Sequence, residues 1–162
     1  MANLKLGCLL FMILIVAFFL YPVPVLELKT EKNDRILFLK RVSSGEPFIF
    51  QYVHSVEKIT VQGFFIITSR GMIQLVETQF PSFGPGLPFM KNEVILEKDK
   101  MRATSKIEEM ENFSFFVSPF TLPQLTFKDE RFDFSSLKEG ELVTLRVRRY
   151  PLGGFLLNEV KR

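Results

Sequence analysis

The residues HSVEKITVQGFFIITSRGMIQLVETQFPSFGPGLP, positions 54–88, determine how this chain folds. They contain two long runs rich in β-branched and aromatic residues, 60–68 and 72–80, separated by Ser69-Arg70-Gly71. Two such runs joined by a short glycine-containing connector predict a β-hairpin. Gly63, inside the first run, indicates a bulge or a close approach of another group to the backbone.

Shorter runs of the same kind surround this hairpin, and turn-forming residues separate them roughly every 8–12 residues. The pair Gly153-Gly154 predicts a last short hairpin, and no amphipathic helix is predicted after residue 26. The pattern therefore predicts an all-β domain, an antiparallel sandwich or barrel-like fold of about eight or nine short strands. Sixteen of the 19 phenylalanines follow residue 26, so we expect a core rich in phenylalanine.

An uninterrupted apolar segment precedes the predicted strands. Leu6–Leu26 is 21 residues long and carries no charge, and roughly 20 apolar residues of helix cross a bilayer. Pro22 and Pro24 would end such a helix, and Tyr21 suits the membrane interface. We therefore expect residues 1–26 to form a membrane anchor, contacting the bilayer through residues 6–26, and residues 27–162 to form the β domain.

A cleaved signal peptide is the alternative to an anchor. An uncleaved single-pass anchor is favoured because the small residues of an A-x-A-like cleavage site are missing after Ala17. Lys5 and the amino terminus favour a cytoplasmic N-terminus, which places the domain on the extracytoplasmic side of the cell membrane. If the segment is cleaved, the domain is secreted or periplasmic. Five basic residues between Lys29 and Arg41 argue for the opposite orientation.

Composition excludes several classes of protein. After residue 26 the chain carries 20 Lys/Arg and 18 Asp/Glu, so it is nearly neutral and has no basic stripe that predicts a nucleic-acid partner. The single cysteine, Cys8, excludes an intramolecular disulfide and a cysteine metal cluster.

His54 is the only histidine, and Glu57 and Glu77 are its candidate partners. No nucleophile motif accompanies them, and one histidine is a poor basis for a zinc or iron site. We therefore predict no catalytic residue, no metal and no cofactor, and expect His54 to bond to the backbone of a turn at a strand end. Glu77 lies in mid-strand and needs water or a cation, for which Arg70 and Arg102 are candidates.

Residues 82–88 combine two glycines with two prolines, so no regular element passes through them. Glycine allows a ligand or partner to approach the backbone closely, but the Lys, Ser/Thr and helix of a phosphate loop are missing. A rigid loop that shapes a contact surface is favoured, and a purely structural crossover is the alternative. The candidate contact residues are His54, Ser55, Glu57, Glu77, Ser82, Phe83, Gly84, Gly86, Leu87 and Pro88.

Four motifs in this order resemble the family named for domain of unknown function 1850. They are Tyr52-Val53-His54-Ser55-Val56-Glu57, Val61 with Phe64-Phe65, Leu75-Val76-Glu77-Thr78 and Ser82-Phe83-Gly84-Pro85-Gly86-Leu87-Pro88. This chain departs from the family pattern at Thr60-Val61-Gln62-Gly63, where an acid is common, and at Pro85, where alanine is common.

The resemblance implies an accessory role, since similar proteins accompany tripartite ATP-independent periplasmic (TRAP) transporters of the TAXI type. The expected function is a membrane-tethered domain that contacts the transporter's permease or its solute-binding subunit. A small-ligand module using His54, Glu77 and the glycine loop is the first alternative. A hydrolase-like enzyme is the second, and the pattern argues against it.

Overall fold

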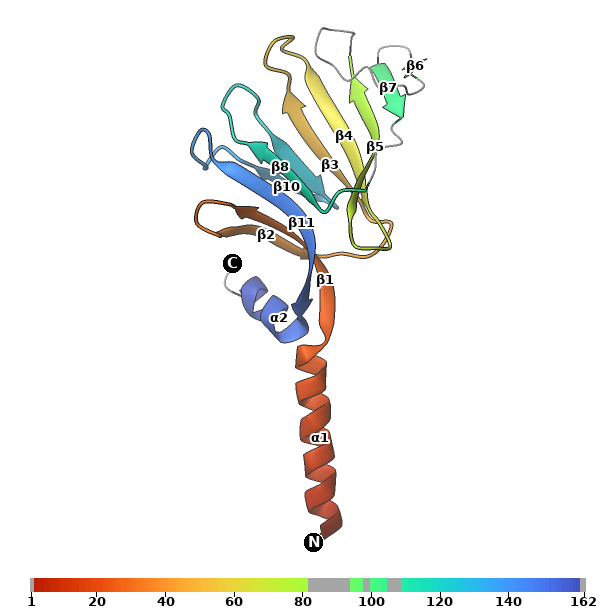
Figure 1. Ribbon diagram of the computed structural model, residues 1–162, viewed down its shortest axis with the longest axis vertical. Helices are drawn as coiled ribbons and strands as arrows, with labels where there is room; N and C mark the ends of the chain where they lie inside the picture. Colours follow the sequence, from red (N-terminus) through yellow and green to blue (C-terminus); the bar gives the residue numbers. More distant parts are fainter. Residues whose placement is uncertain (1, 82–93, 98–99, 105–108, 161–162) are drawn as a thin grey trace.

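The computed structural model describes residues 2–81, 94–97, 100–104 and 109–160. A helix, α1 (Ala2–Leu20), stands below a body of β-strands, and a short helix, α2 (Leu152–Val160), lies beside the junction between the two (Figure 1). The predicted all-β class is confirmed. The strands of the described residues number eleven rather than eight or nine, and they form two sheets, not one closed barrel.

All strand pairs are antiparallel, as the frequent turns predict. The smaller sheet has the order β2-β1-β11-β8 and the larger one the order β10-β9-β3-β4-β5-β7-β6. The strands of the smaller sheet are β1 (Pro22–Thr30), β2 (Ile36–Arg41), β8 (Asn112–Phe116) and β11 (Leu142–Pro151). Those of the larger sheet are β3 (Pro47–Val53), β4 (Thr60–Ile67), β5 (Ile73–Phe80), β6 (Val94–Glu97), β7 (Lys100–Thr104), β9 (Gln124–Phe127) and β10 (Glu130–Asp133).

The predicted hairpin is the β4–β5 pair. Phe65 lies opposite Leu75 and Phe64 opposite Glu77, so Val76 is the extra residue of a β-bulge. A Cβ added to Gly63 would lie 2.7 Å from Cε2 of Phe65. The expected close approach at Gly63 is therefore confirmed, whereas the bulge lies at Val76 of β5 and not at the glycine.

Phenylalanines fill the space between the sheets, as the composition predicts. Phe48 and Phe65 stack face to face with ring centroids 4.9 Å apart. The ring of Phe50 packs against those of Phe113 and Phe115 from the smaller sheet, with ring centroids 4.9 and 4.6 Å apart. Such aromatic contacts add roughly 0.5–1.5 kcal/mol each beyond area burial, so this cluster holds the two sheets together.

The apolar N-terminal segment divides earlier than the sequence suggests. The helix ends at Leu20, and residues 22–26 belong to β1, where Val23, Val25 and Leu26 are buried. Pro22 is the first residue of the strand, a position that tolerates a missing N–H. Within the described residues no helix combines the length and the apolarity that crossing a bilayer requires.

The last hairpin predicted at Gly153-Gly154 is wrong, since these residues lie in α2. The N–H of Leu152 donates to the carbonyl of Tyr21 at 2.9 Å, and Phe155 is buried against Val23, Val25 and Leu39. Gly153 lies against α1, where an added Cβ would be 2.8 Å from Phe19. Tertiary packing therefore outweighs the low helix propensity of two glycines.

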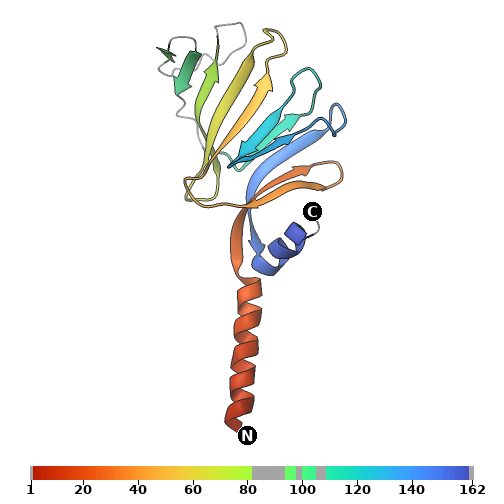
Figure 2. The same cartoon turned by 180° about the vertical axis from the view of Figure 1, so that it is seen from behind.

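The sandwich has two ends. At the neck end, where α1 joins β1, Val42 donates to the carbonyl of Pro24 and Gly45 to that of Ile67, at 3.0 and 2.8 Å. The turns 42–46 and 68–72 lie at this end. Because β3 runs away from it, the turns 54–59, 117–123 and 134–141 lie at the opposite, far end (Figures 1 and 2).

Candidate functional site

The turn 54–59 carries the HSVE motif and joins β3 to β4. The N–H of His54 donates to the carbonyl of Ile59 at 2.8 Å, and the N–H of Lys58 to that of His54 at 2.9 Å. Nδ1 of His54 accepts the N–H of Glu57 at 3.2 Å. The predicted bond from His54 to the backbone of a turn is confirmed, and the imidazole thereby closes the turn that presents Ser55 and Val56 to solvent.

The loop 118–122 lies beside this turn. The N–H of Val53, the last residue of β3, donates to the carbonyl of Thr121 at 2.6 Å. Ser118 organises the loop: its Oγ accepts the N–H of Phe120, and its carbonyl accepts those of Thr121 and Leu122, all at 3.2 Å. Two segments about 60 residues apart in sequence therefore form one surface.

Four large apolar side chains at this end of the molecule are exposed to solvent. Val56 is 71% exposed, Phe120 66%, Leu122 61%, and Phe116, at the end of β8, 67%. We call these four side chains the far-end surface. Contiguous patches of exposed apolar side chains mark sites of interaction with other molecules, so this end of the molecule is the candidate site.

Leu122 also has an unfavourable backbone conformation. Its φ is +41°, in the left-handed region that a bulky residue avoids. Such strain costs about 1–2 kcal/mol and is retained where the surrounding structure imposes it, commonly at functional sites. Asp34, Lys58 and Lys128 also have positive φ, so the conformation makes the exposed Leu122 a candidate functional residue without singling it out.

A cavity of about 410 Å³ opens next to the loop. Its lining includes the buried Val117, Phe134 and Leu137 together with Leu122 and the carboxyl residues Asp133 and Glu139. The side chain and the backbone N–H of Ser135 bond to the carboxylate of Asp133, at 2.5 and 3.0 Å, and lower its pKa. The cavity is therefore apolar inside and acidic at its edge.

Glu77 lies away from the far-end surface, on the outer face of the larger sheet. Its carboxylate is 3.0 Å from Nε of Arg102 and accepts Nε2 of Gln79 at 2.6 Å. The expected pairing with a cation is confirmed, with Arg102 as the cation. Phe64, opposite Glu77, is four residues along β4 from Thr60, which pairs with Val53. That is roughly 13 Å along the strand, so the described geometry does not bring His54 and Glu77 together.

Six of the predicted contact residues lie outside the described residues. They are Ser82, Phe83, Gly84, Gly86, Leu87 and Pro88. Of the other four, His54, Ser55 and Glu57 are in the turn 54–59, and Glu77 is in the outer-face ion pair. β5 ends at Phe80, which packs with Val61 and Tyr52 close to the turn.

Sequence reasoning missed two features. One is the loop 118–122, whose signal is an apolar pair, Phe120 and Leu122, between two prolines. The other is Glu27, whose signal is an acid in a strand of buried valines.

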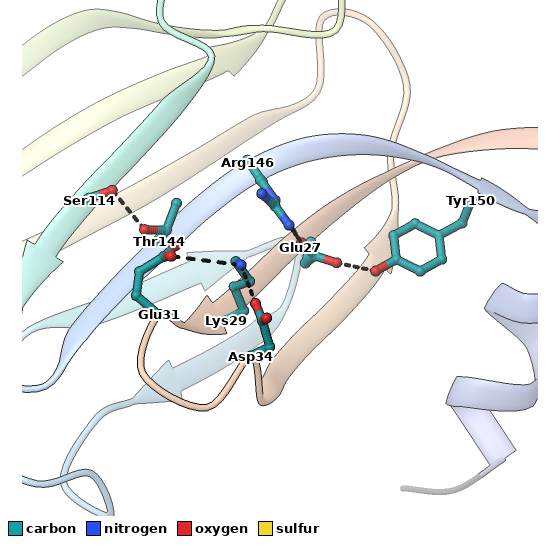
Figure 3. A network of polar contacts seen from close by, with 8 residues as sticks. All are labelled: Glu27, Lys29, Glu31, Asp34, Ser114, Thr144, Arg146 and Tyr150. Carbon is teal, nitrogen blue, oxygen red and sulfur yellow. Dashed lines mark hydrogen bonds and ion pairs between the residues drawn. The ribbon is translucent and has the colours of Figure 1, made fainter.

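Glu27 is 1% exposed and anchors a polar network in the smaller sheet (Figure 3). Nε of Arg146 donates to its carboxylate at 2.7 Å, and the hydroxyl of Tyr150 donates to its other oxygen. Burial, followed by the bond to Glu27, raises the pKa of Tyr150 to about 12. Both partners lie on β11, so the network ties β1 to β11 near α1 and has a structural role.

Comparison with known proteins gives one match. The family model described as Domain of unknown function (DUF1850) matches residues 48–134, from β3 to just past β10. This range contains the turn 54–59 and the whole far-end surface. No curated protein and no solved structure matches this chain.

Proposed function

The chain belongs to the DUF1850 family, and from this premise we propose that it is a membrane-anchored, extracytoplasmic accessory domain that binds a protein partner through its far-end surface. The single observation that carries the proposal is the exposure of Val56, Phe116, Phe120 and Leu122 at the end opposite α1. A surface at that end is free to meet a partner when the neck end faces a membrane.

Although the described part of α1 lacks the length and apolarity that crossing a bilayer requires, its exposed apolar surface supports the anchoring part of the proposal. The residues Leu9 to Val16 make just over two helical turns, so their side chains point in every direction around the helix axis. Each of these apolar side chains is at least 43% exposed. A helix that is apolar all round requires an apolar environment, in a protein core or a membrane. Among the described elements α2 is the one that packs appreciably on α1, and we therefore assign the remaining surface of α1 to lipid.

The partner we propose is the permease or the solute-binding subunit of a TAXI-type TRAP transporter. This part follows from the resemblance of the HSVE, LVET and glycine-loop motifs to a family whose members accompany such transporters. The chemistry of the far-end surface is compatible with it, since exposed aromatic and aliphatic side chains beside an acidic cavity edge favour a protein surface over a nucleic acid.

The cavity next to the far-end surface supports a second candidate function. Its volume of about 410 Å³ is within the roughly 300–1,000 Å³ range of small-molecule sites. A small, mostly apolar ligand with a cationic group would match its lining. The His54–Glu77 arrangement offers less support, because those residues lie on different parts of the larger sheet.

Co-purification of purified components tests the main proposal. The full chain, tagged at its C-terminus, is captured in mild detergent with the purified permease or solute-binding subunit. We expect Phe120→Asp/Leu122→Asp to reduce recovery of the partner at least about tenfold, because a buried charge at an apolar contact costs more than 1.4 kcal/mol.

The matched control is Ser69→Asp, which adds a negative charge to an exposed turn at the neck end. It should leave recovery unchanged. Equal recovery by the double variant and the wild type would refute the assignment of the far-end surface. Failure of both subunits to bind the wild type would refute the proposed partner.

A further inference from the structure

Three exposed arginines surround β1 just above α1. Arg41 of β2 and Arg148 of β11 lie on either side of Val25, and Arg149 lies opposite Pro24. Cross-strand neighbours share one face of a sheet, so Arg41 and Arg148 occupy one face of the smaller sheet. Arg149, the next residue along β11, occupies the other. The three guanidinium groups therefore flank the neck on both faces.

These three arginines are not held in ion pairs, although Arg148 acts on Asp34 at longer range: the pKa of that carboxyl is lowered mainly by Lys29 and also by Arg146 and Arg148. Other cations of this part of the molecule are paired: Arg70 with Glu109 at 2.8 Å, Lys40 with Glu130 at 2.6 Å, and Lys128 with Glu46 at 3.3 Å. Within the described residues Arg41, Arg148 and Arg149 form no ion pair. The neck consequently presents a localised positive charge.

A cavity of about 200 Å³ adjoins Arg149. It lies between the turns 42–46 and 68–72, and its lining includes Ser43, Ser44 and Ser69 together with Pro24, Arg148 and Arg149. Hydroxyl donors beside a guanidinium suit a phosphate oxygen.

The helix α2 places apolar side chains at the same level. Phe155 faces the sheet, whereas Leu156 and Leu157 are 41% and 67% exposed. The bond from Leu152 to Tyr21 holds the start of α2 at the end of α1 (Figure 1). A short helix with exposed leucines next to basic residues has the composition of an interfacial helix.

The spacing fits a bilayer surface. Pro24 and Val25 are two and three residues after Pro22, which is roughly 7–10 Å along a strand. The polar layer of a bilayer is about 5–8 Å thick on each side, and arginine side chains extend far enough to reach it.

We propose that the neck is a binding site for anionic phospholipid: Arg41, Arg148 and Arg149 bind headgroup phosphates, and Leu156 and Leu157 enter the acyl boundary. This inference rests on the membrane anchoring in the proposed function. To the proposed function it adds the class of lipid that the domain binds. It also explains the orientation of the domain, because headgroups bound on both faces of the sheet hold the strands upright and direct the far-end surface away from the membrane.

Lipid retention tests the inference. The full chain is reconstituted into nanodiscs of phosphatidylcholine mixed with phosphatidylglycerol, and the lipids that remain bound after gentle detergent release are quantified by native mass spectrometry. An arginine near an anionic surface contributes about 1 kcal/mol, or about fivefold in affinity. We expect the wild type to retain phosphatidylglycerol over phosphatidylcholine at least about tenfold, and Arg148→Gln/Arg149→Gln to lose most of this preference.

The matched control is Lys32→Gln/Arg35→Gln, which removes the same charge from the exposed turn between β1 and β2 at the far end. It should keep the preference. Inorganic phosphate added to phosphatidylcholine discs distinguishes a lipid headgroup from a free anion as the ligand. If phosphate alone protects the wild type against thermal unfolding, the ligand is a soluble anion and the proposal is overturned.

Extraction distinguishes this inference from the proposed function. A chain that alkaline carbonate removes from membranes would contradict the anchoring itself. A chain that stays in the membrane but retains both lipids equally would contradict the lipid site alone. Loss of the preference in the Lys32/Arg35 control would also overturn it, by showing that net charge rather than the neck selects the lipid.

Discussion

The backbone N–H of Val53 donates to the carbonyl of Thr121 at 2.6 Å, and this bond connects the two segments that form the far-end surface. Val53 ends β3 immediately before the HSVE turn, and Thr121 lies between the exposed Phe120 and Leu122. The shape of the turn and that of the loop 118–122 therefore depend on each other. His54 shapes this surface through the backbone of the turn, because its Nδ1 accepts the N–H of Glu57.

The first prediction concerns His54 as a positioning residue. His54→Ala removes the acceptor of the Glu57 N–H, a loss that should lower the free energy of unfolding by about 1 kcal/mol. His54→Asn keeps a short side-chain acceptor, which commonly serves this role in turns, and should recover most of the loss. Urea unfolding measures both, and partner recovery should follow the same order. The opposite outcome is that His54→Asn is as stable as the wild type but recovers as little partner as His54→Ala. That result would indicate chemistry at the imidazole instead.

The second prediction separates stability from binding at Leu122. Leu122→Gly relieves a backbone strain of about 1–2 kcal/mol in the folded protein. It also makes the unfolded chain more flexible, which lowers the free energy of unfolding by about 0.4–1 kcal/mol. We expect the urea midpoint to stay equal or rise slightly, while partner recovery falls severalfold because an exposed apolar side chain is lost. Unchanged recovery would show that the strained leucine is not part of the contact.

Gly63 supports a third prediction, because its strand is locked against the phenylalanine core. Gly63→Ala places a Cβ 2.7 Å from Phe65 and 3.3 Å from Leu75. Phe65 is buried and stacked on Phe48, so it has little room to move. Overpacking of this kind costs about 1–3 kcal/mol, measurable by thermal unfolding. Gly45→Ala is unsuitable as a control because Gly45 has a φ of +85°, whereas Ser69→Ala, at an exposed turn position, should leave the unfolding temperature nearly unchanged.

The sequence predicts the local parts of this structure well and the long-range parts poorly. Alternation and the Ser69-Arg70-Gly71 connector identify the β4–β5 hairpin, since both signals act between neighbours in the chain. The helix α2 depends on contacts of Phe155 with β1 and of Gly153 with α1, at least 130 residues away in sequence. No local pattern reports such contacts, and the glycine pair favours the wrong element.

The candidate site shows the same division. The HSVE turn is recognisable from its residues, whereas its partner, the loop 118–122, becomes part of the site through the pairing of β3 with β9 and the single bond at Val53. The sequence groups Glu77 with His54 because an acid is a natural partner for the only histidine. The antiparallel register places them in different parts of the larger sheet.

The last prediction concerns the alkaline limit of stability, which Tyr150 sets in part. Its pKa is raised from 10.0 to about 12 in the folded protein, by burial first and then by the bond to Glu27. Below pH 10 the phenol is protonated in both the folded and the unfolded chain. Between pH 10 and about 12 the unfolded chain loses this proton and the folded one keeps it, so the free energy of unfolding falls as the pH rises through that window.

Tyr150→Phe removes the titrating group and should flatten this decline, although the variant is less stable at neutral pH because Glu27 loses a hydrogen bond. Urea unfolding at a series of pH values measures both effects. Lysine titration occurs in the same window and is common to both proteins, so the difference between wild type and variant isolates Tyr150. That difference should shrink between pH 10 and 12. A constant difference across this range would mean that the phenol does not keep its proton in the folded state, and that the network around Glu27 is looser than its hydrogen bonds indicate.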